Sequence, residues 1–196
     1  MNLDFVFGFG YPIELYLPKD EYNNIKADLE DGDLKIEDSF IFRDVDFHVE
    51  SGDIYLSNIT MEELAAETGS GQICLTDSKS SYTTLKVESG DIEVENLICE
   101  KTFGVETGSG ELLLTNVDAE QDFKAQTDSG DIRLKSCDGQ NLELKTSDGS
   151  VTGSLKTTKS FDAKASSGDV NLPANGNGGN CIIRTESGDI DISIED

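Results

Sequence analysis

Positively charged residues are scarce: 15 Lys and Arg stand against 40 Asp and Glu, for a formal net charge of −25 in 196 residues. This excess of negative charge repels phosphate backbones and anionic headgroups, so nucleic acid and anionic lipid surfaces are disfavoured as direct partners. Long apolar runs are missing as well, and no stretch approaches the roughly eighteen residues that a membrane helix needs. We therefore expect no direct membrane insertion by this segment.

The start of the chain has little of what a targeting signal needs. Met1–Tyr11 is apolar, but it contains Asp4 and lacks the basic region with which secretory signals begin. The protein is therefore expected in the cytoplasm or, if an anchor or signal lies outside this sequence, at the cell envelope or in the extracellular space.

Histidine is also scarce, and the cysteines are not paired in the sequence. The chain has one His, and its four cysteines, Cys74, Cys99, Cys137 and Cys181, share no paired spacing. Neither a disulfide framework nor a zinc site is indicated, so we expect reduced thiols and no cofactor. Apolar residues make up 36% of the chain beside 19 Gly, which favours a folded core over a disordered acidic chain.

The abundant glycines reveal a repeat. Nine of them recur at intervals of 19 or 20 residues, with Ser-Gly-Asp-Ile as the fullest motif: Gly32, Gly52, Gly71, Gly90, Gly110, Gly130, Gly149, Gly168 and Gly188. Apolar or small residues lie seven, five and three positions before each Gly and two and four positions after it. Such alternation predicts strands with one buried face. The odd step between the two sets requires a bend at Ser-Gly-Asp, whose residues suit turns.

A second bend is expected about six residues after the Gly, at Asp38, Asn58, Asp77, Asn96 and Asn116. Each repeat is then one coil with two strands and a short third side. Because one coil cannot bury its apolar face alone, identical coils stack and equivalent strands pair along one axis. We predict an all-β, single-domain parallel β-solenoid (β-helix) of about nine coils, right-handed and about 40 Å long.

Other repeat architectures fit poorly. Hexapeptide helices repeat in multiples of six, calcium-binding nonapeptide repeats need tandem Gly-Gly-x-Gly-x-Asp, and leucine-rich repeats need a helix in each unit. Only Met61–Glu67 is compatible with a helical turn, and it fits the lead-in to a strand equally well.

The two ends differ from the repeats. Residues 1–24 are predicted to be strands that cap the solenoid, and residues 25–196 are the repeats of the same domain; the alternating apolar positions of the cap are Phe5, Phe7, Phe9, Ile13, Leu15 and Leu17. The last coil ends at Ile190, Ile192 and Ile194 without a visible cap. Since an open sheet edge invites pairing, we expect the terminal acids, residues outside this sequence or a partner subunit of a homo-oligomer to protect this C-terminal coil.

The repeated Ser-Gly-Asp-Ile motif, preceded by Ile13-Glu14-Leu15-Tyr16-Leu17-Pro18, resembles a bacterial family catalogued as adhesins and as a domain of unknown function. The resemblance covers nearly the whole chain. It implies a β-solenoid of bacterial envelope or surface proteins, and it carries over no catalytic residues.

Stacking turns each outward position of the repeat into a ladder of side chains. The position after the Gly is acidic in seven of nine coils: Asp33, Asp53, Gln72, Asp91, Glu111, Asp131, Ser150, Asp169 and Asp189. Adjacent carboxylates about 5 Å apart repel by about 1 kcal/mol in water. We expect turn amides to offset this repulsion. The less favoured alternative is a metal ladder, with a divalent cation bridging Asp91, Glu111 and Asp131.

Catalysis is not expected. The serines before the Gly have no accompanying base, and His48, the one imidazole, is predicted to face solvent. Thr68, Thr107, Thr127, Thr146 and Thr185 share their parity with apolar residues, which predicts hydroxyls bonded inside or near a corner. The outward positions four before the Gly form a mixed polar face: His48, Glu67, Lys86, Glu106, Gln126, Lys145, Lys164 and Arg184.

Three functions follow as hypotheses. The favoured one is a non-catalytic structural or binding module, adhesin-like, at the bacterial cell envelope, which recognises a protein or glycan ligand through long flat faces. The second is an intracellular or membrane-associated scaffold that self-associates through the end of the solenoid. The third is an enzyme acting on a glycan, although uniform coils without insertions offer no cleft for it.

Overall fold

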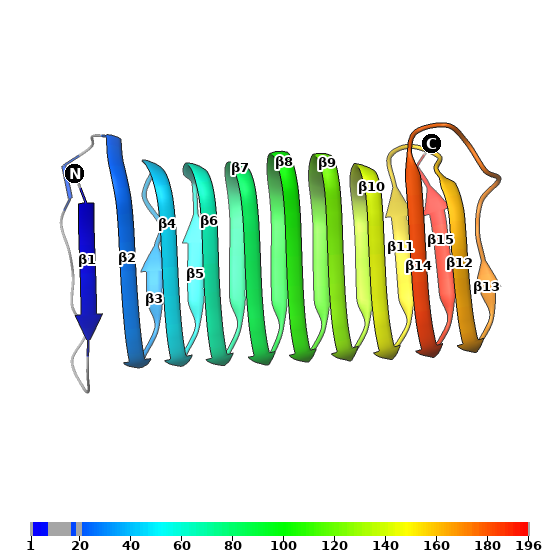
Figure 1. Cartoon of the computed structure of the whole chain (residues 1–196), viewed down its shortest axis with the longest axis horizontal. Helices are drawn as coiled ribbons and strands as arrows, with labels where there is room; N and C mark the ends of the chain where they lie inside the picture. Colours follow the sequence, from blue (N-terminus) through cyan, green and yellow to red (C-terminus); the bar gives the residue numbers. More distant parts are fainter. Residues whose placement is uncertain (1, 8–16, 19–20, 196) are drawn as a thin grey trace.

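The computed structural model describes residues 2–7, 17–18 and 21–195, and these form an all-β rod (Figure 1). One sheet joins fifteen strands: β1 (Asn2–Phe7), β2 (Glu21–Asp31), β3 (Leu34–Ile36), β4 (Phe40–Ser51), β5 (Ile54–Ser57), β6 (Ile59–Ser70), β7 (Ile73–Ser89), β8 (Ile92–Ser109), β9 (Leu112–Ser129), β10 (Ile132–Asp148), β11 (Val151–Leu155), β12 (Ser160–Ser167), β13 (Val170–Asn171), β14 (Asn180–Ser187) and β15 (Ile190–Ile194). None of the described residues is helical.

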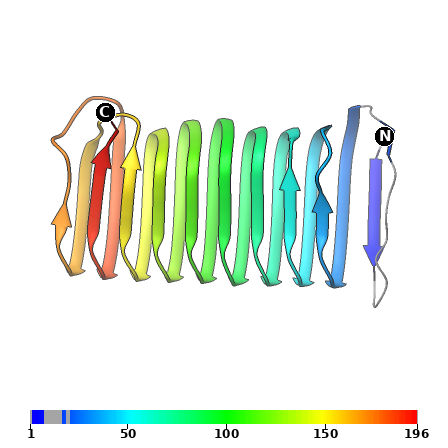
Figure 2. The same ribbon diagram turned by 180° about the vertical axis from the view of Figure 1, so that it is seen from behind.

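Every strand pairing along the rod is parallel. The register follows the repeat: Phe47 lies beside Ala66, and Ala66 beside Leu85, at one position of successive coils. In Figure 1 the chain descends the front face, turns at the lower edge, ascends the rear face and advances from left to right. Figure 2 shows the same coils from behind. This winding is right-handed, and the predicted parallel β-solenoid is confirmed.

The core is a stack of inward side chains between the front and rear walls. In the rear wall, Ile54, Ile73 and Ile92 have no exposed surface. In the front wall, Phe103 and Phe123 lie on adjacent coils with ring centroids 4.9 Å apart. Because each buried aliphatic or aromatic side chain stabilises the fold by about 1.5–3 kcal/mol, this burial is the main favourable contribution to folding.

The corner at Ser-Gly-Asp requires glycine. Gly90 has a φ of +140°, and a Cβ on this residue would lie 1.9 Å from the carbonyl oxygen of Gly71 in the neighbouring coil. Both the backbone conformation and the close approach therefore disfavour any other residue. The second bend also lies where the sequence predicts it, with φ between +48° and +58° at Asn58, Asp77, Asn96, Asn116 and Ser136.

The structure tests two predictions for the N-terminal half: a possible helical turn at Met61–Glu67 and the strands that cap the solenoid. Met61–Glu67 is extended within β6, so the helical alternative is wrong. β1 pairs with β2, and β2 already begins at Glu21, so the stacked strands start before residue 25. Phe5 and Phe7 belong to β1 and Leu17 packs against the core, whereas Phe9, Ile13 and Leu15 lie outside the described residues.

The C-terminal coil does not lie at the end of the rod. On the front face β14 lies between β10 and β12, and on the rear face β15 lies between β11 and β13 (Figure 1). We call residues 160–171 (β12 and β13) the end coil and residues 180–194 (β14 and β15) the inserted coil. The prediction that Ile190, Ile192 and Ile194 form an uncapped end is therefore wrong.

Apolar content accounts for this order. The inserted coil buries Ile183 and Ile190, which are at most 1% exposed. The end coil offers Phe161, Ala163 and Ala165, which are only partly buried. A coil with neighbours on both sides removes more surface from water, so the larger aliphatic side chains gain more in the inner place. The glycine spacing stays regular through both coils, so it could not reveal the exchange of order.

Candidate functional site

The acid ladder binds backbone amides of adjacent coils. Five backbone amides donate to the Oδ1 atom of an aspartate in an adjacent coil, over 2.7–3.0 Å. The donor and acceptor pairs are Asp53 to Asp33, Gln72 to Asp53, Glu111 to Asp91, Ser150 to Asp131 and Asp169 to Asp189. Because an anionic acceptor strengthens a hydrogen bond, each contact offsets part of the repulsion between neighbouring carboxylates. The local offset that the sequence predicts is confirmed.

Protein groups surround the three acids of the hypothetical metal ladder. Asp91 accepts the amide of Glu111, and the guanidinium of Arg133 contacts both Glu111 and Asp131, with 3.0 Å between Nη2 and Asp131 Oδ2. Arg133 thus supplies positive charge between two of the acids. Within the described part of the chain, no group of three or more His, Cys, Asp or Glu residues could hold a metal ion. The metal ladder remains a hypothesis without a converging ligand set.

The threonine ladder lies inside the corner. Thr68, Thr107, Thr127, Thr146 and Thr185 are at most 5% exposed. Their hydroxyls donate to glycine carbonyl oxygens of the neighbouring coil over 2.8–3.2 Å. As predicted, these hydroxyls hold corners together.

The serine ladder and His48 lie apart. The His48 side chain is 46% exposed, and its Nδ1 lies 3.9 Å from Glu67 Oε2 on the adjacent strand. The serines lie at the corners, where the carbonyl oxygen of Ser51, for example, accepts the Gly32 amide at 2.9 Å. Among the described residues, no hydrogen bond or ion pair joins His48 to a serine. This arrangement offers no activated nucleophile.

The cysteine thiols are also unsuited to nucleophilic chemistry. All four cysteines are unpaired, and Cys99, Cys137 and Cys181 are buried. Burial raises the pKa of Cys137 to about 11 and that of Cys181 to about 12, and it also raises the pKa of the half-buried Cys74 thiol. Since the thiolate is the nucleophile, the raised pKa values disfavour nucleophilic chemistry at Cys74, Cys137 and Cys181.

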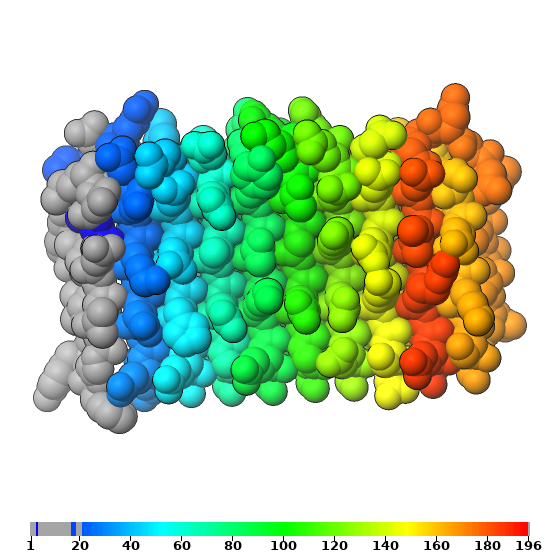
Figure 3. Space-filling model, viewed as in Figure 1, coloured from blue at the N-terminus to red at the C-terminus, as the bar shows by residue number. Residues whose placement is uncertain are grey.

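Two shallow depressions mark the front face near the C-terminal end of the rod (Figure 3). The upper one has a volume of about 400 Å³ and is lined by Asp122, Lys124, Asn141, Leu142, Glu143, Ser160, Asp162, Asn180 and Ile182. The lower one, about 390 Å³, is lined by Gln126, Thr127, Asp128, Lys145, Thr146, Ser147, Lys164, Ser166, Arg184, Thr185 and Glu186. Both lie over β9, β10, β14 and β12, which we call the C-terminal front face.

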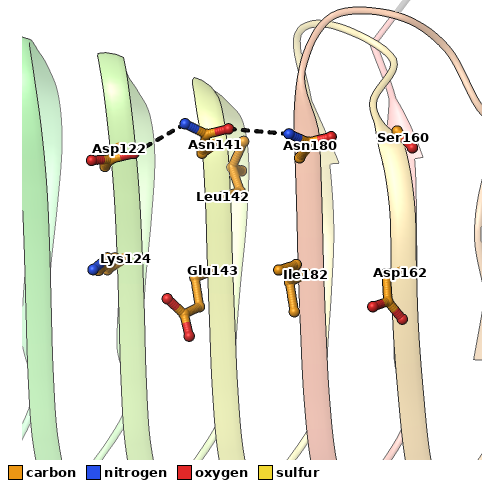
Figure 4. A pocket seen from close by; sticks show the side chains of 9 residues that line it. All are labelled: Asp122, Lys124, Asn141, Leu142, Glu143, Ser160, Asp162, Asn180 and Ile182. Atoms are coloured by element: carbon orange, nitrogen blue, oxygen red, sulfur yellow. Dashed lines mark hydrogen bonds between the residues drawn. The ribbon is translucent and has the colours of Figure 1, made fainter.

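A row of amide and carboxylate groups crosses the upper depression (Figure 4). Asn180 Nδ2 donates to Asn141 Oδ1 at 3.3 Å, and Asn141 Nδ2 donates to Asp122 Oδ1 at 3.1 Å. Ser160 continues this row on the end coil. Below the row, Ile182 is 39% exposed and adds an apolar surface. The depression therefore presents fixed hydrogen-bonding groups beside an apolar side chain.

Three basic residues occupy one position of consecutive coils in the lower depression. Arg184 pairs with Lys145 on one side and with Lys164 on the other. Arg184 Nη2 lies 2.7 Å from Asp162 Oδ2, and Lys145 contacts Glu143, whose carboxyl pKa is lowered by the hydrogen bond from Lys145. Along the whole rod this position carries acidic, neutral and basic residues, as the sequence predicts. The signal for a local basic cluster was that its last three coils all carry Lys or Arg.

A family model described as Toastrack DUF4097 matches residues 1–152 and, in a second match, residues 84–196. No curated protein and no solved structure matches the chain. Among the described residues, no helix could cross a membrane.

Proposed function

The chain belongs to the Toastrack DUF4097 family, and we propose that it is a non-catalytic recognition module that binds a glycan along its C-terminal front face. The observation that carries this proposal is the amide and carboxylate row of Asp122, Asn141 and Asn180 beside the exposed Ile182. Planar amides and carboxylates are suited to sugar hydroxyls, which both donate and accept hydrogen bonds. An apolar side chain beside such groups can pack against the face of a sugar ring.

The shape of the site agrees with an extended ligand. The two depressions follow one another along the same four strands, so the ligand can contact both without entering a deep cavity. The charges on this face nearly balance, because four basic residues accompany five acids, whereas the whole chain carries a net charge of −25: Lys124, Lys145, Lys164 and Arg184 beside Asp122, Asp128, Glu143, Asp162 and Glu186. A glycan that carries carboxylate groups therefore fits this face better than the remaining acidic surface.

Direct binding tests the proposal. The full chain is titrated with neutral and uronate-containing oligosaccharides, and we expect affinity for the acidic ones to fall as salt rises. Asn141→Ala and Asn180→Ala should weaken binding by about tenfold each, as for a hydrogen bond worth about 1.4 kcal/mol. Thr102→Ala is the matched control, because Thr102 occupies the same row on β8 but does not line the depression. Equal losses in all three variants, or binding of peptides alone, would contradict the glycan proposal.

We place this activity at the bacterial cell envelope, as an adhesin-like module. The support is the net charge of −25 on the whole chain together with the row of Lys145, Arg184 and Lys164 on the C-terminal front face. Fractionation of cells that express the native gene product, followed by detection of the protein in envelope and cytoplasmic fractions, tests this location. An exclusively cytoplasmic protein would favour the scaffold described next, and turnover in a polysaccharide screen would favour a glycan-acting enzyme.

A scaffold that self-associates through its end is the second candidate. The end coil supports it: within the described sheet, β12 pairs only with β14 and β13 pairs only with β15, so each has one free edge. Val170 on this coil is 46% exposed. Sedimentation at rising protein concentration should then show dimers, and Val170→Lys should weaken them because a charged residue on a sheet edge opposes pairing. A monomer at all concentrations would contradict this candidate.

A further inference from the structure

We propose that the inserted coil is exchangeable, so that residues 176–194 of a second copy of this chain can occupy the slot between β10–β11 and the end coil. The proposal rests on the order of the coils and does not depend on the glycan ligand. The partner is another molecule of the same chain, and the interaction surface is the slot itself, not the free edge of the end coil.

To reach the slot, the chain reverses its direction of advance along the rod. From β12 on the front face it passes to β13 on the rear face and then returns to β14, one coil backwards along the rod (Figure 1). This crossover between parallel strands is left-handed, whereas about 98% of such crossovers are right-handed. The inserted coil is therefore joined to its neighbours by an unfavourable connection, and its position is determined by non-covalent contacts.

Those contacts can form equally well with a segment from another molecule. Cys181, Ile183, Ile190 and Ile192 are at most 3% exposed within the slot. On the slot's inner wall, Thr185 donates to the Gly149 carbonyl at 2.9 Å; on its outer wall, the Asp169 amide donates to Asp189 at 2.9 Å. Because the empty slot would expose apolar surface and the four unpaired edges of β10, β11, β12 and β13, we expect it to be filled by this segment from either molecule.

A buried lysine keeps the slot open at a width of one coil. Lys159, directly before the end coil, is 1% exposed, and its Nζ donates to the Gly139 carbonyl at 2.7 Å and contacts the Asp138 carboxylate. Both partners belong to the coil on the far side of the slot. The third bond of Nζ goes to the carbonyl of Gly178, at 2.7 Å, on the segment that enters the slot. Lys159 thus holds both walls in place whichever molecule supplies Gly178.

The short connection before the segment is the hinge. Pro173 and Ala174 form no strand and follow directly after β13 and Leu172. The next residues are already bound to the connection that precedes the end coil, since the Gly176 amide donates to the Lys159 carbonyl at 2.8 Å. Short hinges that cannot relax favour exchange between molecules over closure within one. Shortening this hinge should therefore convert monomers into exchanged dimers.

Disulfide trapping tests the exchange. In a Cys74→Ser background, one chain carries Glu143→Cys on β10 and the other carries Ile182→Cys on β14, two positions that face each other in the register. The two chains are unfolded together, refolded at rising concentration and oxidised. We expect a covalent heterodimer whose yield increases with concentration. The matched control pairs Ile182→Cys with Lys124→Cys, which lies beside residue 143 but one coil further from β14.

Two outcomes separate the alternatives. A heterodimer yield no higher than that of the Lys124→Cys control at every concentration would overturn the proposal, as would a folded, strictly monomeric variant that lacks residues 173–175. A single chain that carries both Glu143→Cys and Ile182→Cys, oxidised in the folded monomer before the unfolding step, should stay monomeric at every concentration, because the disulfide locks its own inserted coil in the slot. Val170→Lys should leave the trapped dimer unchanged, because that substitution affects association through the free edge and not exchange through the slot.

Discussion

The backbone amide of Asp189 donates a hydrogen bond to the hydroxyl of Ser150 over 3.1 Å, although 39 residues separate them. In a solenoid that stacks its coils in sequence order, the neighbour of Ser150 would be Asp169. Here Asp169 lies one coil further out and binds Asp189 instead. The acid ladder therefore continues across the inserted coil with the same hydrogen bonds as elsewhere, which shows that the inserted coil is a regular member of the stack.

Substitution of a corner glycine should be more costly inside the rod than at its start. Gly90→Ala places a Cβ 1.9 Å from a backbone oxygen and requires a left-handed φ of +140°. We expect a loss of unfolding free energy above the 1–3 kcal/mol typical of backbone strain alone, about 3 kcal/mol or more. Gly32→Ala is the matched control, because its φ is +112° but no atom lies within 4 Å of the added Cβ. Urea titrations of both variants measure the difference; equal losses would refute the role of the close approach.

The stability that the acid ladder contributes should depend on its oxygen acceptors and not on its negative charge. Asp91→Asn keeps an oxygen that can accept the Glu111 amide, now bound at 2.7 Å, and removes one negative charge. Asp91→Ala leaves that amide without its acceptor and should cost about 1–2 kcal/mol. We expect the Asn variant to lie within about 0.5 kcal/mol of the parent chain. Melting curves with calcium and with chelator complete the test: a higher midpoint with calcium that disappears in Asp91→Asn would support the metal ladder instead.

The sequence predicts those features of the fold that recur in every coil. The repeat glycines, the alternation around them and the turn residues such as Asn96 predicted the solenoid, both bends and the inward threonines, because each of these features repeats in every coil. The order of the last two coils was missed, because it depends on whether Ile183 or Ala163 gains more from the inner place. The buried Lys159 was missed for a different reason: no other described lysine is buried, so the repeat gives no signal for an inward ammonium at this corner.

Buried thiols should make the rod sensitive to alkaline pH. Cys137 and Cys181 have pKa values raised from 9.0 to about 11 and about 12, because burial disfavours the thiolate. A raised pKa contributes stability that is fully present below pH 9 and is lost as the pH rises through the pKa of the folded state. The unfolding free energy should therefore fall between about pH 9 and 12. The Cys137→Ala/Cys181→Ala chain corrects for other groups; if its pH profile has the same slope as the parent, the thiols are not responsible.

Loss of the buried ammonium should detach the end of the rod and leave the rest intact. Lys159→Met keeps the length of the side chain but removes the bonds to Gly139, Gly178 and Asp138. Removing one partner of a buried ion pair costs about 3–5 kcal/mol, and the partial exposure of Asp138 places the expected loss at the lower end. Lys164→Met is the matched control, since Lys164 lies on the same coil with its side chain in solvent. Hydrogen exchange should accelerate in β12–β15 of Lys159→Met while β6–β9 stay protected, because coils stabilise mainly their direct neighbours. Uniform acceleration along the whole rod would instead indicate that the chain unfolds as one cooperative unit, and would contradict a local role for Lys159.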